Sequence, residues 1–528
     1  METCTSLPPI KDRFRHQQEA FDRFKDASCI PIFFDPGLGK TRTIIDIACH
    51  KYRTGQIDSA IIIAPNGVHE QWAREEIPMW CDVPHDIWIK TDKRPTPEWE
   101  RKPTLKFLCV NVDRFSTPTS WRWYVDFVRD HKVFLVVDEA TRIKNPDAKR
   151  TKNIMYGFND VRWKGRTIVS NTPMTVARAV LTGTPVTNRP FDVWAMFEFL
   201  KPGCTGRNWY TFQSHFGLWR TMVQGNRQFR VLITEEIWTA IRYCKTFETA
   251  NTVFGIGYDD YCKIKRQDKY EGCYDNLPEL KAWLYERAIF ANIEECFDMP
   301  EKMYVRRSLD MSKEQAAAYK AMKSEFIAEY GDTSTSVTTQ LACSIRLKQI
   351  ASGFMVPDEK FDEDPDPGDV TWFKDVPKMK RILSDIDEIG GRCVVVTTFT
   401  AEAYRLYDEL TEAGYTVCLQ TGSKRVGTIE DFKNGRYQIM IANIRIISMG
   451  FNLQAVCHHI LFYSNTYSFE DRRQTEGRIY RANQQDKCVF IDYVMNGSVD
   501  EDILQAQADK KSMSEYIKDK GGLYGKLI

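Results

Sequence analysis

Short runs of consecutive apolar residues alternate with amphipathic segments along the first 200 residues of the chain. Such runs are typical of strands that are buried on both faces of a parallel sheet, with helices between them. This alternation predicts an α/β fold. The expected strands are residues 29–34, 59–65, 105–110, 132–140 and 179–185.

A second set of apolar runs of the same kind occurs later in the chain and predicts a second α/β lobe. The strands expected there are residues 392–399, 415–422, 437–443 and 458–464.

Between the two sets, tryptophan, tyrosine and charged residues recur at helical spacing, which predicts mostly helices. Within this stretch, residues 357–369 combine acidic residues with three prolines, and we expect an exposed loop there because such a composition buries little apolar surface. The expected division is therefore a first lobe at 1–200, a helical insertion at 201–375, a second lobe at 376–500 and a closing helix at 501–528.

Charge and cysteine content limit the kinds of binding site and the cellular compartment to be expected for this protein. Lysine plus arginine number 73 against 72 for aspartate plus glutamate, so the net charge of +1 gives no overall attraction to phosphate, and a nucleic-acid site has to be a local groove. The 15 cysteines are scattered without a CxxC pair, which indicates free thiols in a reducing compartment and no structural zinc. We find no apolar signal segment or membrane span, and we expect a cytoplasmic protein.

The sequence GLGKT at residues 37–41 lies between an expected strand and an expected helix. In that context glycines let the backbone approach phosphates, Lys40 reaches the β- and γ-phosphates of ATP, and the Thr41 hydroxyl binds Mg²⁺. The full P-loop pattern has another glycine five residues before Gly39, where this chain has Phe34. The alternative interpretation is a flexible turn.

The sequence VVDEA ends a buried strand with Asp138 and Glu139, about a hundred residues after the P-loop. Two carboxylates at the end of a strand can hold hydrated Mg²⁺ and polarise the attacking water. As an isolated pair they would more often be a helix cap with a solvated neighbour. The upstream GLGKT favours the catalytic interpretation, with Asp138 and Thr41 as the metal ligands.

Further motifs recur in a fixed order along roughly residues 14–510. FRHQQEAFDRF precedes the P-loop, IIIAPNGVHEQWAREEI and LTGTPVTN follow it, and SMGFNLQAV and QTEGRIYRANQ lie in the second lobe. In these motifs the chain resembles the Swi/Snf-type ATPases of helicase superfamily two, and it looks like a compact bacterial or phage member. The resemblance implies two RecA-like parallel-sheet lobes with a mainly helical insertion between them.

The resemblance also implies roles for particular residues. Gln17 would read adenine, and Arg478 and Arg481 would be arginine fingers, since a permanently charged guanidinium stabilises charge on a phosphoryl group in transfer. The other interpretation of these arginines is a solvated surface helix. The remaining residues expected to contact nucleotide are Pro36, Gly37, Leu38, Gly39, Gly450 and Asn452.

Two departures from the family pattern stand near the expected site. Thr141 follows DEA where most relatives have histidine, so the connection from this motif to LTGTPVTN is expected to differ. Gly477 stands where many relatives have aspartate before the first arginine. Neither change removes a group that binds phosphate or magnesium, so we do not expect an inactive enzyme.

The expected function is that of an ATP-dependent translocase on nucleic acid, with duplex or branched DNA as the expected partner and replication or recombination proteins as further candidates. Family position puts DNA contacts near Asn66, Gly67, Thr400 and Thr421. The basic residues that could add phosphate contacts, or equally form a solvated face, are Arg346, Lys348 and Lys424.

Three other functions are compatible with parts of the pattern. A helicase would need an element that separates strands, and none is identified in the sequence. A nucleotide-gated scaffold would bind DNA or a protein partner and hydrolyse ATP at a negligible rate. The residues expected to bind magnesium and the expected arginine fingers are present, which favours an active enzyme over this alternative. A single-lobed P-loop kinase leaves the second α/β set and the arginine motif unexplained.

Overall fold

The computed structural model describes residues 12–89, 93–117, 122–163, 167–187, 189–224, 227–267, 272–330, 337–357, 363–448, 452–482 and 484–518. Contacts divide the chain into two compact units. The first comprises Met1–Phe34, Lys40–Phe290 and Met513–Ile528, and the second comprises Asp35–Gly39 and Ala291–Ser512. The division at residues 200, 375 and 500 expected from the sequence stays a prediction.

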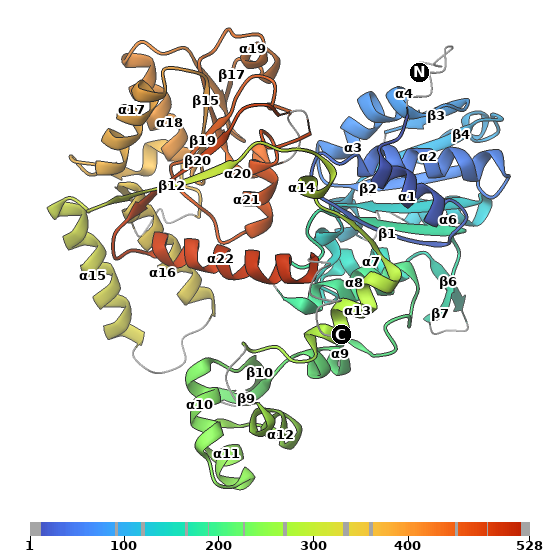
Figure 1. Ribbon diagram of the computed structural model, residues 1–528, viewed down its shortest axis with the longest axis horizontal. Helices are drawn as coiled ribbons and strands as arrows, with labels where there is room; N and C mark the ends of the chain where they lie inside the picture. The colour runs from blue at the N-terminus through green and yellow to red at the C-terminus, as the bar shows by residue number, and fades with distance from the viewer. Residues whose placement is uncertain are drawn as a thin grey trace. The chain divides into compact units, whose positions relative to one another are not determined.

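The first unit is built on a seven-stranded sheet with the order β11-β1-β8-β5-β2-β4-β3. Figure 1 labels β1, β2, β3 and β4 of this sheet. All pairings from β1 to β3 in this order are parallel. All six residues of β2 and of β5 are buried, because helices cover both faces of the sheet. The strands are β1 (Cys29–Phe34), β2 (Ser59–Ala64), β3 (His85–Trp88), β4 (Leu105–Asn111), β5 (Val133–Asp138), β8 (Ala177–Leu181) and β11 (Ile289–Ala291).

Helices pack against this sheet around a core that includes Phe33, Leu135 and Phe197. The helical elements of this part are α1 (Arg15–Phe24), α2 (Lys40–Arg53), α3 (Val68–Gln71), the π-helix η1 (Trp72–Glu76), α4 (Ile77–Trp80), α5 (Pro97–Glu100), η2 (Val112–Ser116), α6 (Arg122–Asp130), η4 (Ala140–Ile143), α7 (Lys149–Tyr156), η5 (Pro190–Asp192), α8 (Val193–Leu200) and α9 (Trp209–Phe216). A separate antiparallel ribbon consists of β6 (Asn159–Trp163) and β7 (Thr167–Pro173).

A small helical lobe with its own core also belongs to the first unit (Figure 1). Its buried residues include Leu218, Trp238 and Ile264. The lobe consists of the ribbon β9 (Trp219–Gln224) and β10 (Arg227–Leu232) with α10 (Glu235–Tyr243), α11 (Phe247–Phe254) and α12 (Tyr258–Arg266). Helix α13 (Leu277–Arg287) then leads back to the sheet at β11.

The second unit is built on a seven-stranded sheet with the order β12-β20-β19-β15-β18-β16-β17. Its pairings are parallel except for the final hairpin of β16 and β17. The strands are β12 (Lys302–Leu309), β15 (Cys393–Thr397), β16 (Val417–Gln420), β17 (Arg425–Val426), β18 (Ile439–Asn443), β19 (His459–Phe462) and β20 (Cys488–Met495). A short ribbon pairs β13 (Phe354–Met355) with β14 (Thr371–Trp372).

The helical elements that accompany this sheet include two long helices between β12 and β15 and one after β20. They are α14 (Ile293–Cys296), α15 (Lys313–Tyr330), α16 (Val337–Ser352), η7 (Pro367–Asp369), α17 (Pro377–Ile389), α18 (Thr400–Glu412), α19 (Ile429–Lys433), α20 (Ile444–Ile447), α21 (Phe469–Glu476) and α22 (Val499–Lys518). Helix α22 lies in the region of the closing helix expected at 501–528, whose last ten residues are outside the described ranges, so that boundary stays a prediction. None of the helices in the described ranges combines the length and the apolar character that crossing a membrane requires.

The predicted fold class of two parallel-sheet lobes with helices is confirmed, and every strand predicted from an apolar run is present within a few residues. Strand β12 is a difference, because it lies in the stretch where we expected mainly helices. Its side chains are exposed or half-buried along its whole length, so it has no apolar run to signal it. Of the predicted acidic loop, residues 358–362 lie outside the described residues, while Glu363 and Asp364 are exposed and Pro367–Asp369 forms a short 3₁₀ helix.

Candidate nucleotide site and its relatives

The P-loop joins the end of β1 to the start of α2. Gly37 and Gly39 adopt φ angles of 85° and 75°, in the left-handed region that glycine enters without a steric penalty. Lys40 and Thr41 form the first turn of α2, where backbone N–H groups have no intrahelical partner. The Lys40 ammonium donates a hydrogen bond of 2.9 Å to the carbonyl oxygen of Phe34. The loop therefore has the geometry of an anion-binding turn with its lysine folded back onto the preceding strand.

Asp138 ends β5 in the first unit, to which Lys40 also belongs, and only 6% of its surface is exposed. One carboxylate oxygen accepts a hydrogen bond of 2.7 Å from Trp72 Nε1, and the other accepts one of 2.9 Å from the Glu139 amide. Burial raises the pKa of Asp138 above its ordinary value, while the bond from Trp72 and the charge of Lys40 act in the opposite direction. The charge of Lys40 therefore acts on the Asp138 carboxylate, and the shared role of the two residues in nucleotide binding stays a prediction.

Glu139 has a left-handed backbone, with φ 48° and ψ 58°. A non-glycine residue in this region carries a steric cost of about 1–2 kcal/mol. Strain of this kind is concentrated at functional sites, where the surrounding structure holds it. The strained backbone distinguishes Glu139 from its neighbour Asp138, which is the last residue of the regular strand β5.

Gln17 is buried on α1, and its side-chain oxygen accepts a hydrogen bond of 3.1 Å from the Phe14 amide. The neighbouring His16 packs edge-on against the ring of Phe34, with ring centres 5.2 Å apart. The motif that precedes the P-loop in sequence is therefore anchored beside the end of β1.

The second unit holds both candidate arginine fingers in the segment after α21. Arg478 donates a hydrogen bond to the carbonyl oxygen of Ser448, and its own carbonyl oxygen accepts one of 2.9 Å from the Leu453 amide. Arg481 lies against Gly37, because a Cβ atom built at Gly37 would come within 3.1 Å of Arg481 Nε. Gly37 belongs to the second unit, as Arg481 does. Asn452 is exposed, and Gly450 lies outside the described residues.

An ion pair that the sequence did not reveal holds the start of the P-loop within the second unit. Arg473 on α21 donates to the Asp35 carboxylate at 2.5 Å, and Asp35 also accepts from the amide of Ile293 at 3.3 Å. The Asp35 amide donates in turn to the carbonyl oxygen of Ala291. The two ion-pair partners are 438 positions apart, so no local pattern could have predicted their contact.

The comparisons with known proteins cover nearly the whole chain. The model of the SNF2-related domain matches residues 22–353, and the model of the helicase conserved C-terminal domain matches residues 376–483. The chain belongs to the SNF2-related family. It is accordingly a DNA-dependent ATPase with two RecA-like lobes, and ATP is its nucleotide.

Individual relatives are distant in sequence. Protein p41 of Acyrthosiphon pisum secondary endosymbiont phage 1 is 21% identical, with 98% of both chains covered. A DNA repair and recombination protein RAD54-like of Drosophila yakuba is 22% identical over 92% of this chain, which spans 59% of that relative's length. The uncharacterized ATP-dependent helicase YqhH of Bacillus subtilis is 21% identical over 97% of this chain and 80% of the relative. Among solved structures, the SWI2/SNF2 ATPase core of Sulfolobus solfataricus in complex with dsDNA is 18% identical, with 99% of this chain and 96% of that chain covered and a TM-score of 0.39.

Both departures from the family pattern have a structural counterpart. Gly477 faces Pro36: a Cβ atom at Gly477 would lie 3.0 Å from Pro36 Cβ, so a larger residue there would press on the P-loop. Thr141 is buried and donates to the carbonyl oxygen of Glu139. The segment after DEA instead reaches LTGTPVTN through Lys144, which donates at 2.6 Å to the Thr187 hydroxyl.

Three of the four residues near which DNA contacts were expected, Asn66, Thr400 and Thr421, make hydrogen bonds to other described residues. Asn66 accepts from the side chain of Asn111 at 3.3 Å. The amide and hydroxyl of Thr400, at the start of α18, donate to Asp364 at 2.6 and 2.7 Å, so part of the acidic loop caps this helix. Thr421 is buried and exchanges hydrogen bonds with the backbone of Lys424.

The basic residues named from the sequence differ in exposure: Lys424 is exposed, and the other two are not. Arg346 and Lys348 on α16 are half-buried, and burial lowers the pKa of Lys348 to about 8. The Lys348 ammonium lies 5.1 Å from the centre of the Phe399 ring. Lys424 lies over the rings of Tyr404 and Tyr407.

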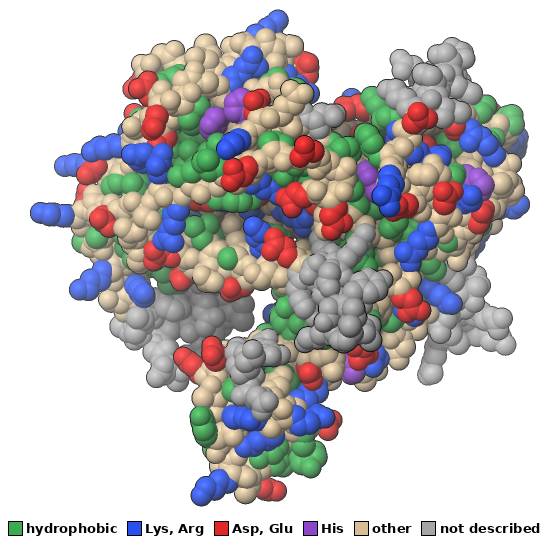
Figure 2. Space-filling model, viewed as in Figure 1, with side chains coloured by type: hydrophobic (Ala, Val, Ile, Leu, Met, Phe, Trp, Pro, Cys, Tyr) green, Lys and Arg blue, Asp and Glu red, His purple; other side chains and the backbone are tan. Residues whose placement is uncertain are grey.

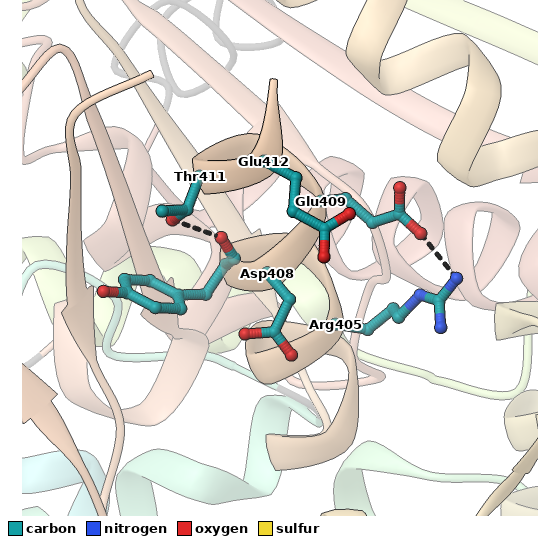
Figure 3. Close-up of a pocket in the computed structure, with 6 residues that line it drawn as sticks. Arg405, Asp408, Glu409, Thr411 and Glu412 are labelled. Carbon is teal, nitrogen blue, oxygen red and sulfur yellow. Dashed lines mark hydrogen bonds and ion pairs between the residues drawn. The ribbon is translucent and has the colours of Figure 1, made fainter. Parts of the chain in front are cut away.

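A hollow of about 300 Å³ on α18 is separate from these motifs (Figure 3). Arg405 and Glu409 form an ion pair of 2.5 Å across one turn of the helix, and Asp408 and Glu412 project beside them. Charged side chains at this spacing are typical of a solvated helix face, so we assign no site to the hollow. Within the described ranges, no group of three or more His, Cys, Asp and Glu side chains is arranged to hold a metal ion.

Proposed function

We propose that this chain is an ATP-driven translocase that moves along duplex DNA and remodels DNA or protein–DNA complexes. The observation that carries the proposal is the contact of Arg481 with Gly37, since it puts a candidate arginine finger against the phosphate-binding loop. A guanidinium beside the transferring phosphate makes hydrolysis depend on the conformation of the segment that carries it.

The proposed roles follow from the chemistry of each group. The amides of the loop from Pro36 to Gly39 surround the phosphates, and Lys40 leaves the Phe34 carbonyl to bind the β- and γ-phosphates. Asp138 and Thr41 hold Mg²⁺, which neutralises phosphate charge when bound. A buried carboxylate at a strand end beside a helix N-terminus fits this ion.

The remaining roles are those of catalysis and of nucleotide recognition. Glu139 orients the attacking water, and Arg478 and Arg481 stabilise the charge that develops on the γ-phosphate. Gln17 recognises adenine, and Gly450 and Asn452 complete the nucleotide contacts from the second lobe. The division into lobes at 1–200 and 376–500 with a helical insertion at 201–375 belongs to the same proposal.

Duplex or branched DNA is the proposed track, and the names of the relatives support it. One family of relatives is named for DNA repair and recombination, which makes proteins of these processes candidate partners. Acidic and basic side chains are interspersed on the face drawn in Figure 2, in agreement with the net charge of +1, so attraction to phosphate has to be local. Stepping arises when closure and opening around ATP alternate the grip on the DNA backbone.

The test is the rate of ATP hydrolysis with single-stranded DNA, duplex DNA, branched DNA or RNA of equal length. We expect duplex or branched DNA to stimulate the rate most, and Lys40→Ala to abolish the stimulated rate. A rate that no nucleic acid changes, and that Lys40→Ala leaves intact, would support the nucleotide-gated scaffold instead. A forked duplex fully separated into single strands would support the strand-separating helicase.

A further inference from the structure

The indole of Trp72 is the one side chain with a described hydrogen bond to the Asp138 carboxylate. Trp72 is 1% exposed, and its Nε1–H donates to Asp138 Oδ2 at 2.7 Å. The second donor to this carboxylate is the amide of Glu139, on the other oxygen. Each oxygen therefore carries one N–H bond, and the plane of the carboxylate is fixed from two directions.

Trp72 stands at a change of helix type. The segment after β2 is helical from Val68 to Trp80, but its middle part, Trp72–Glu76, is a π-helix between two short α-helices. A π-turn adds a residue to the turn, shifts the faces of the helix that follows, and is frequently found at functional sites. Trp72 is the first residue of this turn.

The same segment also contacts the helix that follows the P-loop. The guanidinium of Arg42 on α2 lies 4.5 Å from the centre of the Trp80 ring, at the far end of the segment. The segment begins directly after Asn66 and Gly67, near which DNA contacts were expected from the sequence. One short helical stretch is thus joined to the end of β5 through Trp72 and to α2 through Trp80.

We propose that Trp72 is a positioning residue for Asp138, holding the carboxylate in the orientation that binds Mg²⁺ with nucleotide. This inference rests on the proposed role of Asp138. Partners that hydrogen-bond a metal-binding carboxylate fix its orientation, and their loss typically weakens metal binding or activity by about 10- to 100-fold. A buried tryptophan also tends to satisfy its N–H wherever an acceptor is near, so the test has to separate positioning from packing.

The test compares Trp72→Phe with wild type by fluorescence titration of an N-methylanthraniloyl-labelled ADP. The titration is made once in EDTA and once across a range of Mg²⁺ concentrations. We expect the nucleotide affinity in EDTA to be unchanged and the Mg²⁺ concentration for half-maximal enhancement to rise by about 10- to 100-fold. Because phenylalanine is smaller, a second variant carries 3-benzothienylalanine at position 72, which keeps the ring shape and lacks the N–H.

The matched control is Trp194→Phe. Trp194 is a buried tryptophan of the same unit whose Nε1–H donates to the Arg207 carbonyl oxygen at 2.9 Å, away from Asp138. We expect it to lower the thermal stability and to leave the Mg²⁺ titration unchanged. If the benzothienylalanine variant binds Mg²⁺ as wild type does, Trp72 only packs and the inference is wrong. If wild type itself shows no Mg²⁺-dependent binding, the proposed role of Asp138 fails instead.

Discussion

Replacing Gly37 by alanine perturbs the P-loop in two separable ways. The φ angle of 85° lies in the left-handed region, where an L-residue loses about 1–2 kcal/mol. The added Cβ would also lie 3.1 Å from Arg481 Nε, 3.4 Å from its Cβ and 3.5 Å from its Cγ. The first distance is shorter than ordinary van der Waals contact, so the arginine has to move by a few tenths of an ångström.

Gly55→Ala is the matched control for the cost of placing alanine in a left-handed backbone conformation. Gly55 has a φ angle of 69°, and a Cβ built there meets no atom within 4 Å. Both variants should lower the melting temperature by a similar amount, at about 2–4 °C for each kcal/mol in a domain of this size. Only Gly37→Ala should also displace Arg481.

The assay is the DNA-stimulated rate of ATP hydrolysis, measured beside the melting temperature. We expect Gly55→Ala to retain the wild-type rate and Gly37→Ala to lose up to about tenfold, since a misplacement of about 1 Å at a catalytic centre can cost about 10²-fold and this displacement is smaller. Equal rates for the two variants would refute the reasoning, because the contact between Gly37 and Arg481 would then have no bearing on hydrolysis.

Three further predictions concern charged groups. A double-mutant cycle of Asp35→Asn and Arg473→Ala, measured by urea unfolding, should give a coupling energy of about 1–3 kcal/mol, and a value near zero would contradict the ion pair. Burial lowers the pKa of Lys348 to about 8, so the folded state loses this proton at a lower pH than the unfolded state does. The free energy of unfolding should therefore rise by about 1–3 kcal/mol between pH 8 and 10, and Lys348→Met should remove that rise. Arg178 is fully buried and donates to Thr175 and to two backbone carbonyl oxygens, so Arg178→Met should leave these acceptors without a donor and lower the free energy of unfolding by about 1–3 kcal/mol; no change in the same urea unfolding would contradict this.

Sequence patterns predicted those parts of the fold that depend on local composition. The runs CIPIFF and SAIIIA became β1 and β2 because strands buried on both faces need continuous apolar residues. The P-loop was predictable because its two left-handed residues require glycine.

The features that were missed depend on contacts between distant segments. Strand β12 has little apolar surface of its own and is held by its parallel pairing with β20, nearly 190 positions later. The left-handed backbone of Glu139 is imposed by its surroundings, since glutamate has no preference for it. The pairing of Trp72 with Asp138 joins residues 66 positions apart, and the sequence offered only a tryptophan near acids as a signal.

The central claim is tested most directly by displacement of a third strand from a DNA triplex. A labelled oligonucleotide bound in the major groove of a duplex is released when a motor passes along that duplex, without separation of the two strands. We predict ATP-dependent release by wild type and none by Lys40→Ala. ATP hydrolysis stimulated by the same duplex, with the third strand left in place, would contradict translocation.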